Sequence, residues 1–238
     1  MLTPEQAIPW LTLVHRSDAR VFTFVLVVVY PIVDYLFYFR LKSTFQIYIW
    51  KILGKWSLLA VCVWLIRKNG IRLSDFGEKV GSLPRTLIVS GLLLSIIALL
   101  VIVSKRQIRK PSTEQLSKAV GKVRRLIPVN GRERNLFVAV ALTAGLCEEF
   151  LYRGWLLGLI GYALTSLWAG LFLSAILFGV AHAYQGRNGI VSTSVLGIVF
   201  GLMFIASGSL LPGQVLHIVI DLNNGLALGK IAGRTDKA

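Results

Sequence analysis

Long apolar segments with few charges limit this chain more than any other feature of its sequence. Residues 21–39 and 86–103 are each long enough to cross the ~30 Å hydrocarbon core of a bilayer as a helix. Hydrophobic residues make up 55% of the 238 positions and charged residues only 16%, whereas about 25% charged residues are usual in a soluble domain. This composition predicts an integral membrane protein and argues against a soluble enzyme.

The apolar segments predict an all-α, polytopic membrane bundle of about seven transmembrane helices. An eighth follows if residues near Pro9 to Val14 enter the bilayer, although so short a stretch is more often interfacial. The seven predicted spans are residues 21–39, 45–66, 86–103, 136–160, 164–182, 190–206 and 215–228.

A basic segment divides the chain. The net charge is +15, and residues 105–134 alone carry ten lysines or arginines against two glutamates. The positive-inside rule makes this loop cytoplasmic and anionic lipid its expected neighbour, so nucleic acid is not expected as a partner. Within it, residues 112–127 fit either an amphipathic surface helix or a solvated connector. We predict N-terminal transmembrane helices plus this loop in residues 1–134 and a catalytic helical core in residues 135–238.

Several ionisable residues fall inside the predicted spans. Each costs about 2.5–3.5 kcal/mol to insert, so each suggests a function. Lys51 and Lys55 lie one turn apart on one helical face, and we expect them to reach the membrane interface. The others are Asp34, Glu148, Glu149, Arg153, His182, His217 and Asp221.

The segment CEEFLYRG holds two adjacent acids and one arginine. Glu149 and Arg153 are four positions apart and are expected to pair on one helical face. Glu148 points away from that pair and has no charged partner within its own helix. An unpaired buried carboxylate is suited to take a proton. The alternative is that both acids pair with Arg153 and a neighbouring helix and serve packing alone.

Two later segments carry the histidines. Phe178 and His182 stack on one face of their helix, and His217, Asp221 and Asn224 form a polar stripe on the last span. The stripe fits a functional site better than interhelical hydrogen bonding, which contributes only about 0.6 kcal/mol per bond.

Together these side chains predict hydrolysis. A carboxylate can deprotonate a water molecule, imidazoles can position it, and a histidine or asparagine can stabilise an oxyanion. The same groups, in particular Glu148, His182 and His217, would also suit zinc with an open coordination position. No HExxH, GxSxG or Walker sequence is present.

At these residues the chain resembles the CPBP family of membrane-embedded proteases, which includes the CAAX prenyl endopeptidases and bacteriocin-processing proteins. The motif EExxxR stands as Glu148 to Arg153, FxxxH as Phe178 to His182, and Hxxx followed by Asn or Asp as His217 to Asp221. The resemblance covers about residues 136–229.

The resemblance implies an intramembrane endopeptidase that acts on a membrane-associated or prenylated peptide. Glu148 would activate water, His182 would help to hold it, His217 and Asp221 would form the oxyanion side or a second ligand set, and Glu149 and Arg153 would hold the motif in place. Asp221 replaces the asparagine of the prenyl proteases, and an ionised Asp cannot donate to an oxyanion. Protonated Asp221, or Asn224 one turn on, would then supply the donor.

Two other functions remain open at this stage. The chain could be a non-catalytic membrane scaffold of the same fold, although all three motifs are intact. It could also be a proton-coupled transporter that uses the same charges, but the broken helices and internal repeats of such proteins are not evident.

Overall fold

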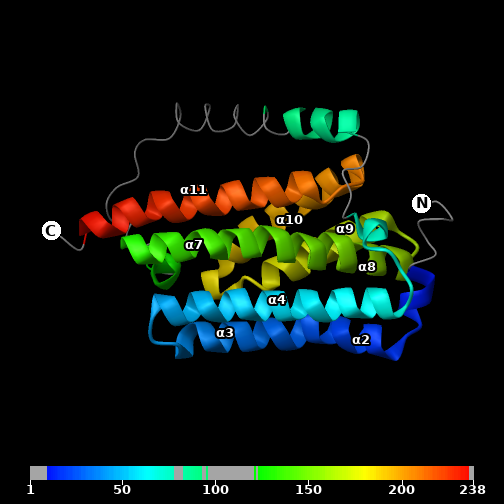
Figure 1. The fold of residues 1–238 in the computed structure, drawn as a ribbon, viewed down its shortest axis with the longest axis horizontal. Helices are drawn as coiled ribbons and strands as arrows, with labels where there is room; N and C mark the ends of the chain where they lie inside the picture. The colour runs from blue at the N-terminus through cyan, green and yellow to red at the C-terminus, as the bar shows by residue number, and fades with distance from the viewer. Residues whose placement is uncertain (1–9, 78–82, 93–94, 96–120, 122, 236–238) are drawn as a thin grey trace.

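The computed structural model describes residues 10–77, 83–92, 95, 121 and 123–235. Within these ranges the regular elements are all helical, in agreement with the predicted class. They run side by side as a bundle, with α2, α3 and α4 along one side and α10 and α11 along the other (Figure 1). The elements are α2 Ser17–Phe24, η1 Val25–Val29, α3 Tyr30–Arg40, α4 Thr44–Lys68, η2 Leu73–Phe76, η3 Arg124–Leu126, α7 Gly131–Thr143, η4 Ala144–Glu148, η5 Phe150–Leu157, α8 Gly158–Ala163, α9 Leu167–Val180, η6 Ala183–Gln185, α10 Arg187–Ser207 and α11 Leu211–Thr235.

Four of the described helices are long and apolar enough to cross a membrane. Consecutive elements merge in two of them, α2 with α3 and α7 with α8. The four are Ser17–Arg40, Thr44–Lys68, Gly131–Ala163 and Arg187–Ser207. They coincide with the predicted spans 21–39, 45–66, 136–160 and 190–206.

The remaining predicted spans are described only in part or differ in length. The span 164–182 corresponds to α9, a shorter apolar helix of 14 residues, and the span 215–228 lies within α11. The span 86–103 begins in the short helix Leu83–Leu92, and residues 93–94 and 96–103 lie outside the described part. Residues 10–14 form a short helix. A total of seven or eight spans therefore stays a prediction.

The exposed and buried residues of the bundle have the pattern of a membrane protein. Large apolar side chains such as Ile32, Trp64 and Phe172 point outward with about half of their surface exposed (55%, 56% and 48%). Several charged side chains are instead buried between the helices. In lipid an apolar exterior carries no solvation penalty, and buried charges must find partners inside the bundle.

Local sequence sets where the helices begin and end. Ser43 and Gln46 form a reciprocal capping box at the start of α4. Asn130 caps α7 and Ser166 caps α9 through their side-chain oxygens. At the other end of α10, Gly208 takes up the left-handed conformation that ends a helix, with φ of 67°. The long apolar helices are therefore bounded by short polar signals.

One apolar core joins the two predicted parts of the chain. Phe22 and Leu58 from the N-terminal part pack in the same cluster as Phe150 and Trp155 from the C-terminal part. The indole nitrogen of Trp155 also donates a hydrogen bond to the hydroxyl oxygen of Thr23, at 3.1 Å. The division at residue 134 stays a prediction, and the described residues on either side of it are packed together.

A glycine brings the first acidic motif close to the last helix. A Cβ atom on Gly145 would overlap the side chain of Ile218 and lie 2.9 Å from the carbonyl oxygen of Gln214. Only a residue without a side chain allows η4 and α11 to approach so closely. This contact sets the helix that carries Glu148 and Glu149 directly against the helix that carries His217.

The basic loop is described only at its end. Residues 105–120 and 122 lie outside the described part, so the predicted helix 112–127 and the lipid-binding role of the loop stay predictions. At the described end, the Arg125 guanidinium donates a hydrogen bond to the carbonyl oxygen of Tyr38 and lies over its ring. This contact ties the end of the loop to the end of α3.

Candidate active site

The two acids of the first motif lie in an unusual stretch of helix. Residues 144–148 and 150–157 have π-helical hydrogen bonding, which is rare and is concentrated at functional sites. Glu148 is 5% exposed, Glu149 is 1% exposed and Arg153 is 2% exposed. All three charges are therefore held inside the bundle, where each needs a partner.

Glu149 links Arg153 to the last helix. Its Oε1 atom accepts a hydrogen bond from Arg153 Nη1 at 3.0 Å, which confirms the pair predicted from their spacing. The same oxygen lies 2.9 Å from His217 Nδ1. The Arg153 guanidinium also lies over the ring of Phe178, 4.2 Å from its centroid. Glu149 therefore orients His217, a contact that the sequence did not indicate.

Glu148 divides its two oxygen atoms between different partners. Its Oε1 atom forms a salt bridge of 2.8 Å with the ammonium group of Lys55 on α4. Its Oε2 atom faces His182 Nε2 at 3.8 Å and His217 Nε2 at 3.7 Å. This second oxygen is buried and accepts no hydrogen bond from the part of the chain that the structure describes.

His182 is fixed by its own helix. Its Nδ1 atom lies 2.8 Å from the carbonyl oxygen of Phe178, four positions earlier. A carbonyl oxygen can only accept a hydrogen bond, so Nδ1 must carry the proton. In the neutral imidazole, Nε2 is then an acceptor that faces Glu148. The ring of Phe178 packs edge-on against His182, with centroids 4.8 Å apart.

His217 is surrounded by carboxylates. Besides Glu149 at Nδ1, its Nε2 atom lies 3.7 Å from Glu148 Oε2 and 3.7 Å from Asp221 Oδ2. The aromatic ring of Phe200 stacks on the imidazole at a centroid distance of 5.1 Å. The predicted stripe of His217, Asp221 and Asn224 lines one cavity together with Glu148 and His182. The structure thus brings all three sequence motifs to one place.

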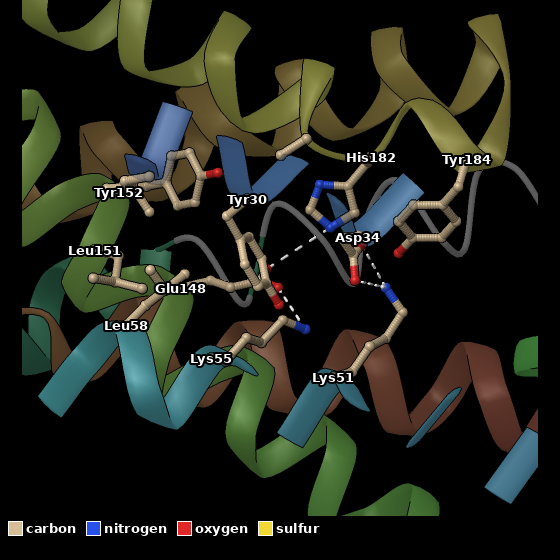
Figure 2. A pocket seen from close by; sticks show the side chains of 12 residues that line it. Tyr30, Asp34, Lys51, Lys55, Leu58, Glu148, Leu151, Tyr152, His182 and Tyr184 are labelled. Atoms are coloured by element: carbon tan, nitrogen blue, oxygen red, sulfur yellow. Dashed lines mark hydrogen bonds and ion pairs between the residues drawn. The ribbon is translucent and has the colours of Figure 1, made fainter. Parts of the chain in front are cut away.

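Two spaces adjoin Glu148. The larger cavity, of about 300 Å³, opens between α4, α9, α10 and α11, and it has both polar and apolar walls. The smaller chamber, of about 30 Å³, lies among Tyr30, Asp34, Lys51, Lys55 and Tyr184. Figure 2 shows Glu148, His182 and both lysines around this chamber. A space of this size holds about one or two water molecules.

The expectation for the two lysines is wrong. Lys51 and Lys55 do not reach the membrane interface, because their ammonium groups pair with Asp34 at 3.0 Å and with Glu148 at 2.8 Å inside the bundle. Glu148 is accordingly not an unpaired carboxylate. The sequence signal was present in the form of two cations and an acid inside predicted spans. It did not reveal which helices lie next to each other.

The zinc alternative is not supported by this geometry. Among the described residues, no three His, Cys, Asp or Glu side chains form a group that could hold a metal ion. The Lys55 ammonium already pairs with Glu148 Oε1 and supplies a cation there. A zinc site at Glu148, His182 and His217 therefore stays a prediction without support from the described residues.

Comparison with known proteins agrees with the arrangement of the motifs. Residues 133–223 match the family model for Rce1-like type II CAAX prenyl endopeptidases. The matched segment contains every residue of the three motifs, whereas Lys55 and Asp34 lie outside it. No curated protein and no solved structure gave a significant match. Through this segment the chain, an integral membrane protein, is similar to the Rce1-like type II CAAX prenyl endopeptidases.

Proposed function

We propose that the protein is an intramembrane endopeptidase that hydrolyses a peptide bond of a prenylated, membrane-associated substrate with water activated by Glu148. The free Oε2 atom of Glu148 between two histidines carries this proposal. A scaffold has no need of a buried carboxylate oxygen that is left without a hydrogen-bond donor, because such a group costs free energy. The family match to residues 133–223 supports the same reaction.

The proposed chemistry follows from the different partners of the two carboxylate oxygens of Glu148. A water molecule bound at Oε2 gives its proton to the carboxylate while its oxygen bonds to the scissile carbonyl carbon. His182 holds this water by accepting a hydrogen bond at Nε2, because its Nδ1–H is directed to Phe178. When the C–N bond breaks, the protonated Glu148 returns the proton to the leaving nitrogen. Water thereby adds OH to the acyl carbon and H to the amine.

In this proposal His217 stabilises the oxyanion that forms on the scissile carbonyl group. Glu149 fixes its Nδ1–H, and two further carboxylates face its Nε2 atom at 3.7 Å. Negative charges around an imidazole favour its doubly protonated form, in which both ring nitrogens donate hydrogen bonds. His217 Nε2–H then stabilises the oxyanion of the tetrahedral intermediate. Asp221 keeps that proton available without itself having to donate.

Asn224 is the candidate for an additional oxyanion donor. It lines the cavity one turn beyond Asp221. On the face formed by His217, Asp221 and Asn224, its side-chain amide is the uncharged hydrogen-bond donor. We expect Asn224→Ala to lower kcat by up to about 100-fold, as loss of one oxyanion-hole donor does. Steady-state cleavage by the purified variant measures this. Asn223→Ala is the matched control, because Asn223 is not among the residues that line the cavity, and it should cleave normally. Near-normal turnover of Asn224→Ala would remove this residue from the mechanism.

The substrate class is tested with a set of matched peptides. One peptide carries a C-terminal prenylated cysteine motif, the second is the same peptide without the lipid, and the third is anchored by an apolar helix. We expect the purified protein, reconstituted in liposomes, to cleave the prenylated peptide much faster than the unmodified one. Equal rates for the first two would contradict prenyl recognition. Preferential cleavage of the third would indicate a transmembrane substrate.

A further inference from the structure

Lys55 on α4 contributes a charged group to a site whose three sequence motifs lie in the family-matched segment. Lys55 stands on α4, its side chain is 11% exposed, and its ammonium lies 2.8 Å from Glu148 Oε1. Residues 133–223, which match the family model, do not include it. Figure 2 shows the side chain of Lys55 extending from α4 toward the carboxylate of Glu148.

We infer that Lys55 is a positioning residue for the proposed hydrolysis. It binds one oxygen of Glu148 and so directs the other to the water-binding position between His182 and His217. This inference rests on the proposed function of Glu148 as the base.

The geometry explains why an anchor is needed. A glutamate side chain has three rotatable bonds, and its carboxylate presents two equivalent oxygens. The Lys55 contact selects Oε1, and Oε2 is left facing His182 Nε2 at 3.8 Å and His217 Nε2 at 3.7 Å. The ammonium also compensates the buried negative charge, which would otherwise favour uptake of a proton and loss of the base.

Lys51 provides an internal comparison. It lies one turn before Lys55 on α4 and is also buried, but it pairs with Asp34, which also accepts a hydrogen bond from the indole of Trp50. Its ammonium lies 4.1 Å from the ring centroid of Tyr184. Both lysines thus form buried ion pairs between helices, and only the pair of Lys55 contains the proposed base. A purely structural role would make the two lysines equivalent.

The groups that face Glu148 come from several helices. Lys55 comes from α4, His182 follows α9, and His217 and Asp221 come from α11. Tyr30 and Tyr152 line the chamber beside it. Among these neighbours only Lys55 is a permanent cation within salt-bridge distance of Glu148. Loss of Lys55 therefore removes the permanent cation from Oε1, whereas the histidines face the other oxygen, Oε2.

The kinetic test compares Lys55→Met with Lys51→Met in the reconstituted full-length protein, with the prenylated peptide as substrate. We expect Lys55→Met to lower kcat by about 100-fold, because a misplacement of about 1 Å in a catalytic group has this effect. KM should change much less than kcat, because Lys55 is a small part of the wall of the larger cavity. Lys51→Met should lower kcat far less, because its ammonium binds Asp34 and not Glu148, and Lys55→Arg should recover part of the lost kcat. Equal losses in the two Met variants, or a normal kcat in Lys55→Met, would overturn the inference.

A stability test holds even if the substrate assignment is wrong. Thermal unfolding in detergent is measured for Lys55→Met alone and in a Glu148→Gln background. We expect Lys55→Met to lower Tm by at least about 6 °C alone, since it leaves Glu148 buried without its cation. In the Gln background it should cost little or nothing, because the two residues act as one pair. Lys51→Met should cost the same in both backgrounds. Additive losses for Lys55 and Glu148 would show that the pair is not coupled.

The two tests separate the inference from the proposed function. If the Tm effects of Lys55→Met and Glu148→Gln are coupled but the wild type cleaves no peptide, the Lys55–Glu148 ion pair is retained and the proposed reaction is rejected. Cleavage by the wild type with a normal kcat in Lys55→Met would retain the proposed reaction and would reject the positioning role.

Discussion

Replacing Glu148 by Gln is expected to lower kcat for the prenylated peptide by about 100- to 10,000-fold, the usual contribution of a general base. The amide has the size of the carboxylate but cannot take a proton from water. It can still accept a hydrogen bond from Lys55, so the fold around the site should persist. Substrate binding should change little, because Glu148 is not the main wall of the larger cavity.

The control for this variant is a second glutamine substitution on the same long helix. Glu133 lies near the start of α7, where its carboxylate accepts a hydrogen bond from the amide of Val129 at 2.8 Å. Glu133→Gln should cleave like the wild type. If Glu148→Gln also retained normal turnover, Glu148 would not be the base, and a non-catalytic scaffold would become the favoured function.

The largest loss of stability is expected from Arg153→Met. Arg153 is 2% exposed and pairs with Glu149, which is 1% exposed. Without the guanidinium, Glu149 keeps a buried charge whose remaining partner is His217. Removing one partner of a buried ion pair costs about 3–5 kcal/mol of unfolding free energy. Denaturant unfolding in mixed micelles measures the loss, together with the yield of folded protein.

An exposed arginine gives the matched comparison. Arg72 pairs with Asp75 at 3.6 Å, three positions on, and its side chain is 84% exposed. Arg72→Met should lower the unfolding free energy by less than about 1 kcal/mol, as expected for a surface ion pair. Similar effects of Arg72→Met and Arg153→Met would contradict the account of Arg153 as the buried counter-ion of the first motif.

The features of this molecule that depend on near neighbours in the chain could be predicted from its sequence. The pair Glu149–Arg153 follows from a spacing of one helical turn and is present at 3.0 Å. The contact between Phe178 and His182, four positions apart, follows in the same way. The helical class also follows, because apolar segments in a bilayer must satisfy their own backbone hydrogen bonds.

Contacts between helices could not be predicted in this way. Nothing in the spacing of Lys55 shows that it faces Glu148, and nothing in the sequence around Glu149 shows that it meets His217. These contacts depend on how α4 and α11 pack against the motif helix, including the close approach at Gly145. Without that packing, two lysines in the first half of a span are reasonably assigned to the interface.

The helix that carries the first motif shows a second feature that could not be predicted from the sequence. The spacing within CEEFLYRG predicts a regular α-helix, whereas the structure has π-helical hydrogen bonding on either side of Glu149. A π-helical turn is wider than an α-helical turn, so side-chain directions differ from those of a regular helix. The α-helical spacing still predicts the neighbour four positions away.

The central claim is that water activated at Glu148 cleaves a peptide bond, and its most direct test is cleavage of the prenylated peptide in water enriched in ¹⁸O. The reconstituted wild type and Glu148→Gln are compared, and the products are analysed by mass spectrometry. The account predicts that the wild type releases two fragments, with one ¹⁸O atom in the new carboxylate of the upstream fragment, and that Glu148→Gln releases almost none. Equal labelled product from both proteins, or fragments without label, would contradict it.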